Sequence, residues 1–309
     1  MNKILIAALA LLATPAIAQN KPIVEIVTSI PVSGSGGQIG FGITNILNSV
    51  QSEREYRFST MPGAQGDTAA LRVLSLANAG QPAVLFNGIT TFTSNRLSKT
   101  TEKDVFDRDN DFIMSYGIGK NALAVMVSPD SDIKTINDLV TKIRSKEITY
   151  SASTLTAPAA SMMNDVFTQH FKIKDKVKQI NYKSPSEIIL AISNKEVDYT
   201  VFTVPDMTNL KALMVSSDQR LETFPNAPTG TEIGVNDFNL NVILLYAIPK
   251  NEDALAKVFE SDMKKACAAP EFDKVSKLRA PYLSFCMLPS DTVATISREN
   301  TTINKMYAR

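Results

Sequence analysis

The sequence contains little of the chemistry on which most catalysis depends. Its 309 residues include one histidine, two cysteines and no tryptophan. Even with an added carboxylate, these three side chains do not readily supply a zinc site of histidine and cysteine ligands. A serine or cysteine nucleophile would have His170 as its single candidate base. The sequence therefore predicts no metal site and disfavours an enzyme.

A surplus of charge of one sign is also absent. The formal net charge is +1 and the pI is near 7.6, whereas a nucleic-acid-binding domain is typically basic. We therefore expect no nucleic-acid partner. A hydrophobic content of 44% argues against disorder, and the length allows two domains, each with a core of its own.

Long apolar runs are missing, and the longest one lies at the start of the chain. Lys3 gives a positive first segment, Ile4–Leu12 is apolar, and Ala16-Ile17-Ala18 has the small-x-small pattern of a signal-peptidase site. The alternative is a retained membrane anchor, but this run is too short for a hydrocarbon core of about 30 Å. We expect a signal peptide over residues 1–18, cleaved after Ala18, and an exported mature chain.

The two cysteines, Cys267 and Cys286, are close to each other in the sequence. Export places them in an oxidising compartment, where such a pair forms a disulfide. The alternative, a catalytic thiol, needs a histidine partner, and nothing in the sequence connects His170 with either cysteine. We therefore predict a Cys267–Cys286 disulfide.

Apolar runs of strand type alternate with amphipathic stretches of helix type along most of the chain. From Glu252 onward the pattern is mostly helical. Such alternation predicts an α/β fold in which helices cover parallel sheets. The expected strands are 23–29, 56–60, 83–86, 148–151, 177–182 and 198–203, and the expected helices are 39–50, 68–78, 134–144, 157–171 and 186–193.

Two longer apolar segments, Phe112–Val127 and Asn239–Ile248, interrupt this alternation. Each is long enough to carry the chain from one lobe to another. We therefore expect two α/β lobes joined by two hinge crossings, with the first lobe built from both ends of the chain. The expected division is residues 19–123 plus 236–309 for lobe 1 and residues 124–235 for lobe 2.

Two loops, each between a predicted strand and a predicted helix, are candidates for anion binding. In the first, Pro31–Gln38, glycines permit a sharp turn while Ser33 and Ser35 offer hydroxyl donors. In the second, Ser151–Pro158, Thr156 is a candidate N-cap. A helix N-terminus directs free N–H groups and the positive end of its dipole towards an anion. The alternative is that the loops are plain turns that only cap their own helices.

Two glycine-containing segments resemble nucleotide sites but lack the required spacing. Gly34 and Gly36 are followed by Gly40, one position later than the dinucleotide fingerprint requires. The segment Gly117–Lys120 lacks the spacing of a phosphate loop and its following hydroxyl residue. We therefore expect no cofactor.

Several motifs together resemble a known family. Ile133–Val140 resembles the helix start "IKT-x-x-DLV", and Ile148–Ser153 resembles a "TY-small-S-S" strand and loop. Phe224–Thr229 with Glu232–Gly234 is similar to "LPDVPT…E-x-G", and Met61–Gly66 is similar to "RPGAGG". In this order along the chain, the motifs resemble the solute-binding receptors of tripartite tricarboxylate transporters, the Bug-type extracytoplasmic receptors.

The resemblance implies a periplasmic-binding-protein-like fold of type II, in which a small organic carboxylate binds in the cleft between two lobes. It also implies a periplasmic receptor, a monomer, that delivers its ligand to membrane transporter subunits. The ligand would be held by backbone amides and hydroxyls, with little help from arginine. Carried over by position, the candidate ligand-binding residues are Ser33, Gly34, Ser35, Gly36, Gln38, Asn87, Thr90, Ser153, Thr154, Thr156, Ala157, Thr203 and Asp206.

The sequence departs from the family pattern at the first loop, which usually reads "PPGG" and ends in "T-D". Here the loop begins Pro31-Val32-Ser33-Gly34, and Gln38 stands near the helix start. Loss of that acid removes a partner for an amino group, which disfavours amino-acid ligands. Two other functions remain open: an exported α/β enzyme acting on a small organic acid, and a subunit that presents a ligand to a sensor kinase.

Overall fold

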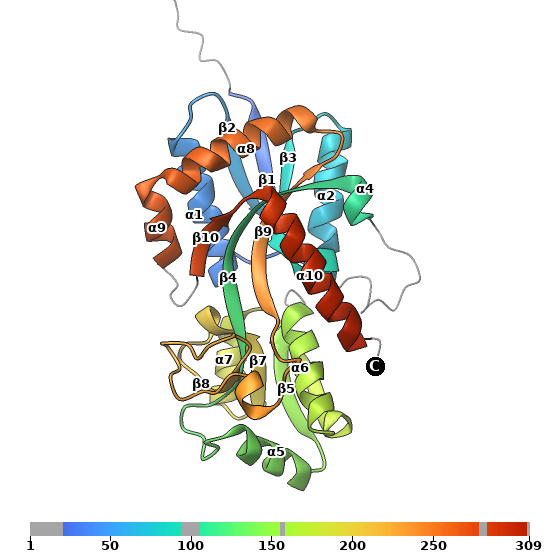
Figure 1. Ribbon diagram of the computed structural model, residues 1–309, viewed down its shortest axis with the longest axis vertical. Coiled ribbons are helices and arrows are strands. Elements are labelled where there is room, and N and C mark those ends of the chain that lie inside the picture. Colours follow the sequence, from blue (N-terminus) through green and yellow to red (C-terminus); the bar gives the residue numbers. More distant parts are fainter. Residues whose placement is uncertain (1–20, 94–105, 155–157, 278–282, 308–309) are drawn as a thin grey trace, which may run out of the picture.

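Strands and helices alternate along the chain, as the sequence predicts, and form two lobes (Figure 1). The computed structural model describes residues 21–93, 106–154, 158–277 and 283–307. The expected signal peptide, 1–18, therefore lies outside the described residues. No helix among the described residues combines the length and apolar character needed to cross a membrane.

The upper lobe in Figure 1 is a mixed sheet with helices on both faces. Strand β1 pairs in parallel with β2 and β3, while β9 runs antiparallel between β3 and β4, and β10 pairs with β4. Its elements are β1 (Ile23–Thr28), α1 (Ser35–Ser49), β2 (Glu55–Thr60), η1 (Ala64–Gly66), α2 (Asp67–Asn78), β3 (Ala83–Gly88), α3 (Thr90–Thr93), α4 (Arg108–Asp111), β4 (Phe112–Val127), β9 (Asn241–Pro249), α8 (Asp253–Ala268), α9 (Pro270–Lys277), β10 (Leu283–Met287) and α10 (Pro289–Tyr307).

The lower lobe has a smaller sheet, in which β5 pairs in parallel with β6 and β7, and the end of β4 runs antiparallel to β7 and β8. Its elements are α5 (Ile136–Ser145), β5 (Thr149–Thr154), α6 (Pro158–His170), η2 (Lys174–Lys176), β6 (Val177–Tyr182), α7 (Pro185–Ser193), β7 (Tyr199–Thr203), η3 (Val204–Asp206), β8 (Lys211–Val215) and η4 (Thr231–Ile233).

The upper sheet buries both of its faces at its centre, where β3 and β9 are apolar at nearly every position. Side chains alternate between faces along a strand. In β3, Val84 and Phe86 therefore pack with α1 and α8, while Ala83 and Leu85 pack with α2 on the opposite face. This is why the sequence shows continuous apolar runs here and not an alternation of polar and apolar residues.

The two predicted crossings are strands β4 and β9, which run from one lobe to the other in Figure 1. The first part of β4, up to Ala122, pairs with β9, and the part from Leu123 pairs with β7 of the lower lobe. Ser216, which is fully buried, holds the two strands together where the lobes meet. Its hydroxyl accepts a hydrogen bond from Leu123 N at 2.9 Å and donates one to Leu240 O at 2.8 Å.

Several elements differ from the sequence prediction, which does not include strand β8 or the short helices α3 and α4. The first helix begins at Ser35, four residues earlier than 39–50 predicts, because its first turn is made by the glycines that the pattern assigns to a loop. The C-terminal region contains the strand β10 in addition to helices. This strand is short and lies between prolines and helical stretches, so its pattern does not stand out from the helical region around it.

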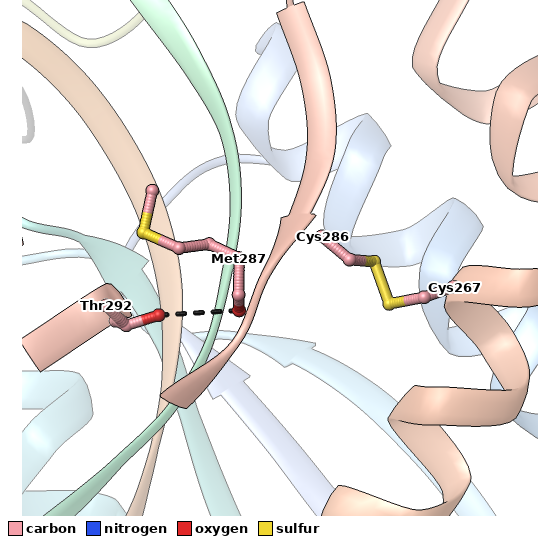
Figure 2. Close-up of a disulfide and its surroundings, with 4 residues drawn as sticks. All are labelled: Cys267, Cys286, Met287 and Thr292. Carbon is pink, nitrogen blue, oxygen red and sulfur yellow. Dashed lines mark hydrogen bonds between the residues drawn. A yellow bond between two sulfur atoms is a disulfide. The ribbon is translucent and has the colours of Figure 1, made fainter. Parts of the chain in front are cut away.

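The predicted disulfide is confirmed. Cys267 near the end of α8 and Cys286 on β10 are bonded across a sequence separation of 19, with Cα atoms 6.0 Å apart (Figure 2). Strand β10 is also held at its next residue, where Thr292 of α10 donates a hydrogen bond to Met287 O at 3.5 Å. The disulfide therefore connects α8, on one face of the sheet, to a strand that pairs with the crossing strand β4.

Removing this disulfide by the double substitution Cys267→Ala and Cys286→Ala is expected to lower the free energy of unfolding by about 3 kcal/mol. The reason is that the bond restricts the unfolded chain to a closed loop of this size. Chemical denaturation of the double variant measures the effect, and the unsubstituted protein under reducing conditions is the matched comparison. Equal stability of the oxidised, reduced and substituted proteins would contradict this expectation.

Candidate functional site

A cavity of about 100 Å³ lies between the two lobes. Residues of both lobes and of the crossing strands line it, and most of them lie at strand ends or helix starts. The lining residues are Ser29, Ile30, Pro31, Gly34, Ser35, Gly36, Gly88, Thr90, Thr91, Asn121, Thr154, Ala159, Ala160, Pro185, Phe202, Thr203, Asp206, Val242 and Leu244.

The upper wall is built at the carboxyl ends of the parallel strands β1 and β3. Asn87, at the end of β3 and fully buried, accepts hydrogen bonds at its Oδ1 from both the backbone N and the hydroxyl of Ser29, each at 2.9 Å. The Thr28 hydroxyl donates a third bond at 3.2 Å. One buried amide thus fixes the point where β1 turns into the first loop.

That loop closes tightly before α1 begins. Gly34 N donates to Pro31 O at 3.0 Å, and Gly34, the N-cap residue, has extended backbone with φ −86°. Glycine has no side chain with which to cap the helix. The carboxylate of Asp206 performs this role from the lower lobe: its Oδ1 accepts a hydrogen bond from Ser35 N at 2.7 Å.

The lower wall is formed by the ends of β5 and β7 and by the first turns of α6 and α7. Thr154 ends β5, and Ala159 and Ala160 lie in the first turn of α6. Beyond β7, the Thr203 hydroxyl donates to Asp206 Oδ2 at 2.5 Å, which fixes the orientation of this carboxylate. Both lobes therefore present a helix start to the same cavity.

The electrostatic character of the cavity is set by one charge. Asp206 is the charged residue among the described lining residues, which include neither lysine nor arginine. The remaining polar groups are hydroxyls, a carboxamide and backbone. The described residues also contain no group of three or more His, Cys, Asp or Glu side chains suited to a metal ion. The described lining therefore offers hydrogen-bonding groups and helix starts, and no positively charged side chain.

His170, the base that a catalytic mechanism would need, lies elsewhere. It is exposed at the last position of α6, and its ring contacts that of Phe171 with centroids 4.8 Å apart. It is not part of the cavity lining.

The structure brings many of the predicted ligand-binding residues to the cavity. Ser33 is exposed and Gln38 is half-buried, and neither lines the cavity, while Asn87 and Ser153 are buried and also absent from the lining. Thr156 and Ala157 lie outside the described residues. The predicted residues that do line the cavity are Gly34, Ser35, Gly36, Thr90, Thr154, Thr203 and Asp206.

The sequence analysis did not identify the residues that the crossing strands contribute. Asn121 of β4 and Val242 and Leu244 of β9 line the cavity between the two lobes. One signal was available, because Asn121 is a polar residue within the apolar run of β4. The length of that run predicts only a connection between the lobes. The wall residues Ser29 and Thr91 were also missed, although each lies close to a predicted strand end.

Comparisons with known proteins agree with this architecture. The profile of the tripartite tricarboxylate transporter family receptors matches residues 84–280. The chain belongs to this family. The match includes the lower lobe, both crossing strands and the helices α8 and α9, and it confirms the resemblance noted in the sequence.

Relatives of this receptor are distant in sequence. A UPF0065 protein of Bordetella pertussis is 31% identical over 103 residues, and the match spans 31% of this chain and 32% of that protein. MatC of Rhodopseudomonas palustris, solved with bound malate, superposes with a TM-score of 0.79 at 13% identity, covering 92% of this chain and 98% of MatC. The periplasmic binding protein BugD gives 0.78 at 15% identity, covering 93% and 96%. These structures show that the receptor has the two-lobed fold of periplasmic binding proteins.

Proposed function

We propose that this receptor captures a small organic carboxylate in the cavity between its lobes and delivers it to a membrane transporter of the tripartite tricarboxylate type. The observation that carries the proposal is the cavity itself, which joins hydroxyl groups and two helix starts from opposite lobes in a member of this receptor family. Two structural neighbours from Rhodopseudomonas palustris support the ligand class: MatC holds malate, and a second protein is described with adipate.

The proposal includes a periplasmic location, with residues 1–18 removed after Ala18, a monomeric receptor and no enzymatic activity of its own. It also includes the division into lobe 1, residues 19–123 plus 236–309, and lobe 2, residues 124–235. Support for this division comes from the buried core of the lower lobe, whose members run from Ala122 to Leu240, while separate cores lie above it.

In this proposal the hinge lies where the two lobes meet, at Ser216, which bonds to Leu123 of β4 and to Leu240, the residue before β9. A ligand shifts the balance between open and closed receptor only through contacts that differ between the two states. A carboxylate that touches both walls makes more contacts when the lobes close. Rotation about the ends of a few strands is the usual form of such a closure.

The proposal is tested by a binding screen with the exported chain, residues 19–309, against small mono-, di- and tricarboxylates, sugars and inorganic phosphate. A carboxylate at about 100 times its dissociation constant should add about 2.7 kcal/mol to the stability of the folded state, visible as a shift of several degrees in melting temperature. Stabilisation by sugars alone, or by no carboxylate, would overturn the proposed ligand class.

A matched pair of substitutions locates the site. Val242 lines the cavity, whereas Val293 of α10 is 48% exposed and lies outside the lining. Val242→Phe adds bulk to the cavity and should remove the ligand-induced shift, while Val293→Phe should preserve it. If both variants respond to the carboxylate as the unsubstituted receptor does, the ligand binds elsewhere.

A further inference from the structure

The carboxylate of Asp206 lies at the first loop, Pro31–Gln38, in the position where the sequence predicts a ligand anion. It lies at the end of η3 in the lower lobe and accepts the N–H of Ser35, the first residue of α1 in the upper lobe, at 2.7 Å. Its other oxygen accepts the hydroxyl of Thr203 at 2.5 Å. The positive end of the α1 dipole is therefore already matched by a negative charge of the protein itself.

This carboxylate retains capacity for further hydrogen bonds. An ionised carboxylate offers about four lone-pair positions and no donor, and the structure fills one position on each oxygen of Asp206. Asp206 is half-buried and forms part of the cavity lining, so a bound ligand lies beside it. This side chain can therefore accept a hydrogen bond from a donor on the ligand, either a hydroxyl or an ammonium group.

A ligand carboxylate, in contrast, is repelled by Asp206, and the described lining offers no lysine or arginine to offset that repulsion. The carboxylate group of the ligand is better placed among the uncharged donors of the cavity, such as the hydroxyl of Thr91 and the carboxamide of Asn121. The cavity thus has a part that suits an anion and a part that suits a donor.

We propose that Asp206 is a specificity-determining residue, which accepts a hydrogen bond from a hydroxyl or ammonium group carried by the carboxylate ligand. This inference rests on the proposed function. It means that the receptor prefers hydroxy- or amino-substituted acids over the unsubstituted acid of the same carbon skeleton. The acid that the first loop lacks near Gln38 is supplied in space by the opposite lobe, so an amino group has a partner after all.

The test uses acids that differ in one substituent. Succinate, malate and aspartate share a four-carbon skeleton with two carboxylates, and propionate, lactate and alanine form the matching series with one carboxylate. Isothermal titration of the exported receptor should show that a hydroxy or amino member binds at least tenfold more tightly than the unsubstituted acid of its series. Comparing the affinity for the hydroxy acid with that for the amino acid of each series shows which donor the receptor prefers.

The variants Asp206→Asn and Asp206→Ala should reduce this preference at least tenfold, because the unsubstituted acid carries no donor whose hydrogen bond could be lost. The control is Asp175→Asn, because Asp175 is an exposed acid of the same lobe outside the cavity. This variant should show the same preference for the substituted acid as the unsubstituted receptor. Melting curves without ligand check that each variant is folded.

The outcomes separate the two proposals. Equal or tighter binding of the unsubstituted acid by the natural receptor overturns the role of Asp206 and leaves the proposed function standing, and this comparison needs no variant. A preference that persists in both Asp206 variants overturns it as well. Failure of every acid in both series, together with failure of the carboxylate screen, overturns the proposed function itself.

Discussion

Replacing Gly37 with alanine is expected to lower the affinity for the ligand about 100-fold or more, equal to about 2.7 kcal/mol. A Cβ atom at this position would lie 2.1 Å from Pro31 O and 2.8 Å from Val32 Cα. Both are backbone atoms, which cannot move aside by changing a rotamer. The first loop must therefore shift, and with it move the upper wall of the cavity and the Ser35 N–H that holds the carboxylate of Asp206 in place.

The matched control is Gly42→Ala on the same helix. A Cβ atom at Gly42 would approach the side chain of Val275 on α9, with Cγ1 at 2.7 Å and Cγ2 at 3.0 Å, so any adjustment falls on the packing of α1 against α9 and not on the cavity lining. Isothermal titration should show near-natural affinity for this variant and a large loss for Gly37→Ala, while circular dichroism shows that both are folded. A folded Gly37→Ala receptor with natural affinity would show that the first loop takes no part in binding.

Much of the fold is predictable from the sequence because its patterns are local. The predicted strands and helices of the lower lobe agree with the structure to within a few residues, and Val177–Tyr182 is the strand that the pattern predicts. The crossing strand β4 has the bounds predicted for the first crossing, Phe112–Val127, because an apolar run of this length without a helical period has few other uses in an α/β fold.

The start of α1 shows where local patterns fail. Glycine at three of the four positions 34–37 reads as a turn, since glycine is a weak helix former. The helix nevertheless begins at Ser35, because its first free N–H group is satisfied by Asp206, which lies 171 positions later in the chain. No window of sequence around the loop contains that residue, so the boundary depends on how the lobes meet.

The residues that line the cavity are also determined in part by how the lobes meet, so local sequence patterns identify only some of them. Strand ends and helix starts can be recognised because turn-forming and hydroxyl residues mark them. Val242 and Leu244 line the cavity as ordinary apolar residues of a buried strand, and nothing in their sequence context differs from that of the core residues beside them. Only the crossing geometry of β4 and β9 brings them to the space between the lobes.

A buried ionic network in the upper lobe offers a stability test that is independent of ligand binding. Asp262 of α8, which is 2% exposed, pairs with Arg54 at the start of β2 and accepts a hydrogen bond from the hydroxyl of Tyr56 at 2.8 Å. Burial, reinforced by the bond to Asp262, raises the pKa of Tyr56, so this phenol remains a protonated donor. The network joins α8 to the outermost strand of the sheet.

Asp262→Asn is expected to lower the free energy of unfolding by about 3 kcal/mol, because it removes the buried counter-charge of the largely buried guanidinium of Arg54, whose remaining partner, Glu53, is 79% exposed. The control is Glu55→Gln on the same strand: the Glu55–Arg57 pair is about half exposed, and such pairs contribute less than about 1 kcal/mol. Urea denaturation measures the stability of both variants.

Asp262 lies outside the cavity lining, so at room temperature the folded Asp262→Asn variant should bind its carboxylate with natural affinity. Equal stability losses in the two variants would show that the buried network contributes no more than a surface ion pair. Lost affinity in a folded Asp262→Asn receptor would instead show that the packing of α8 on β2 is coupled to the cavity.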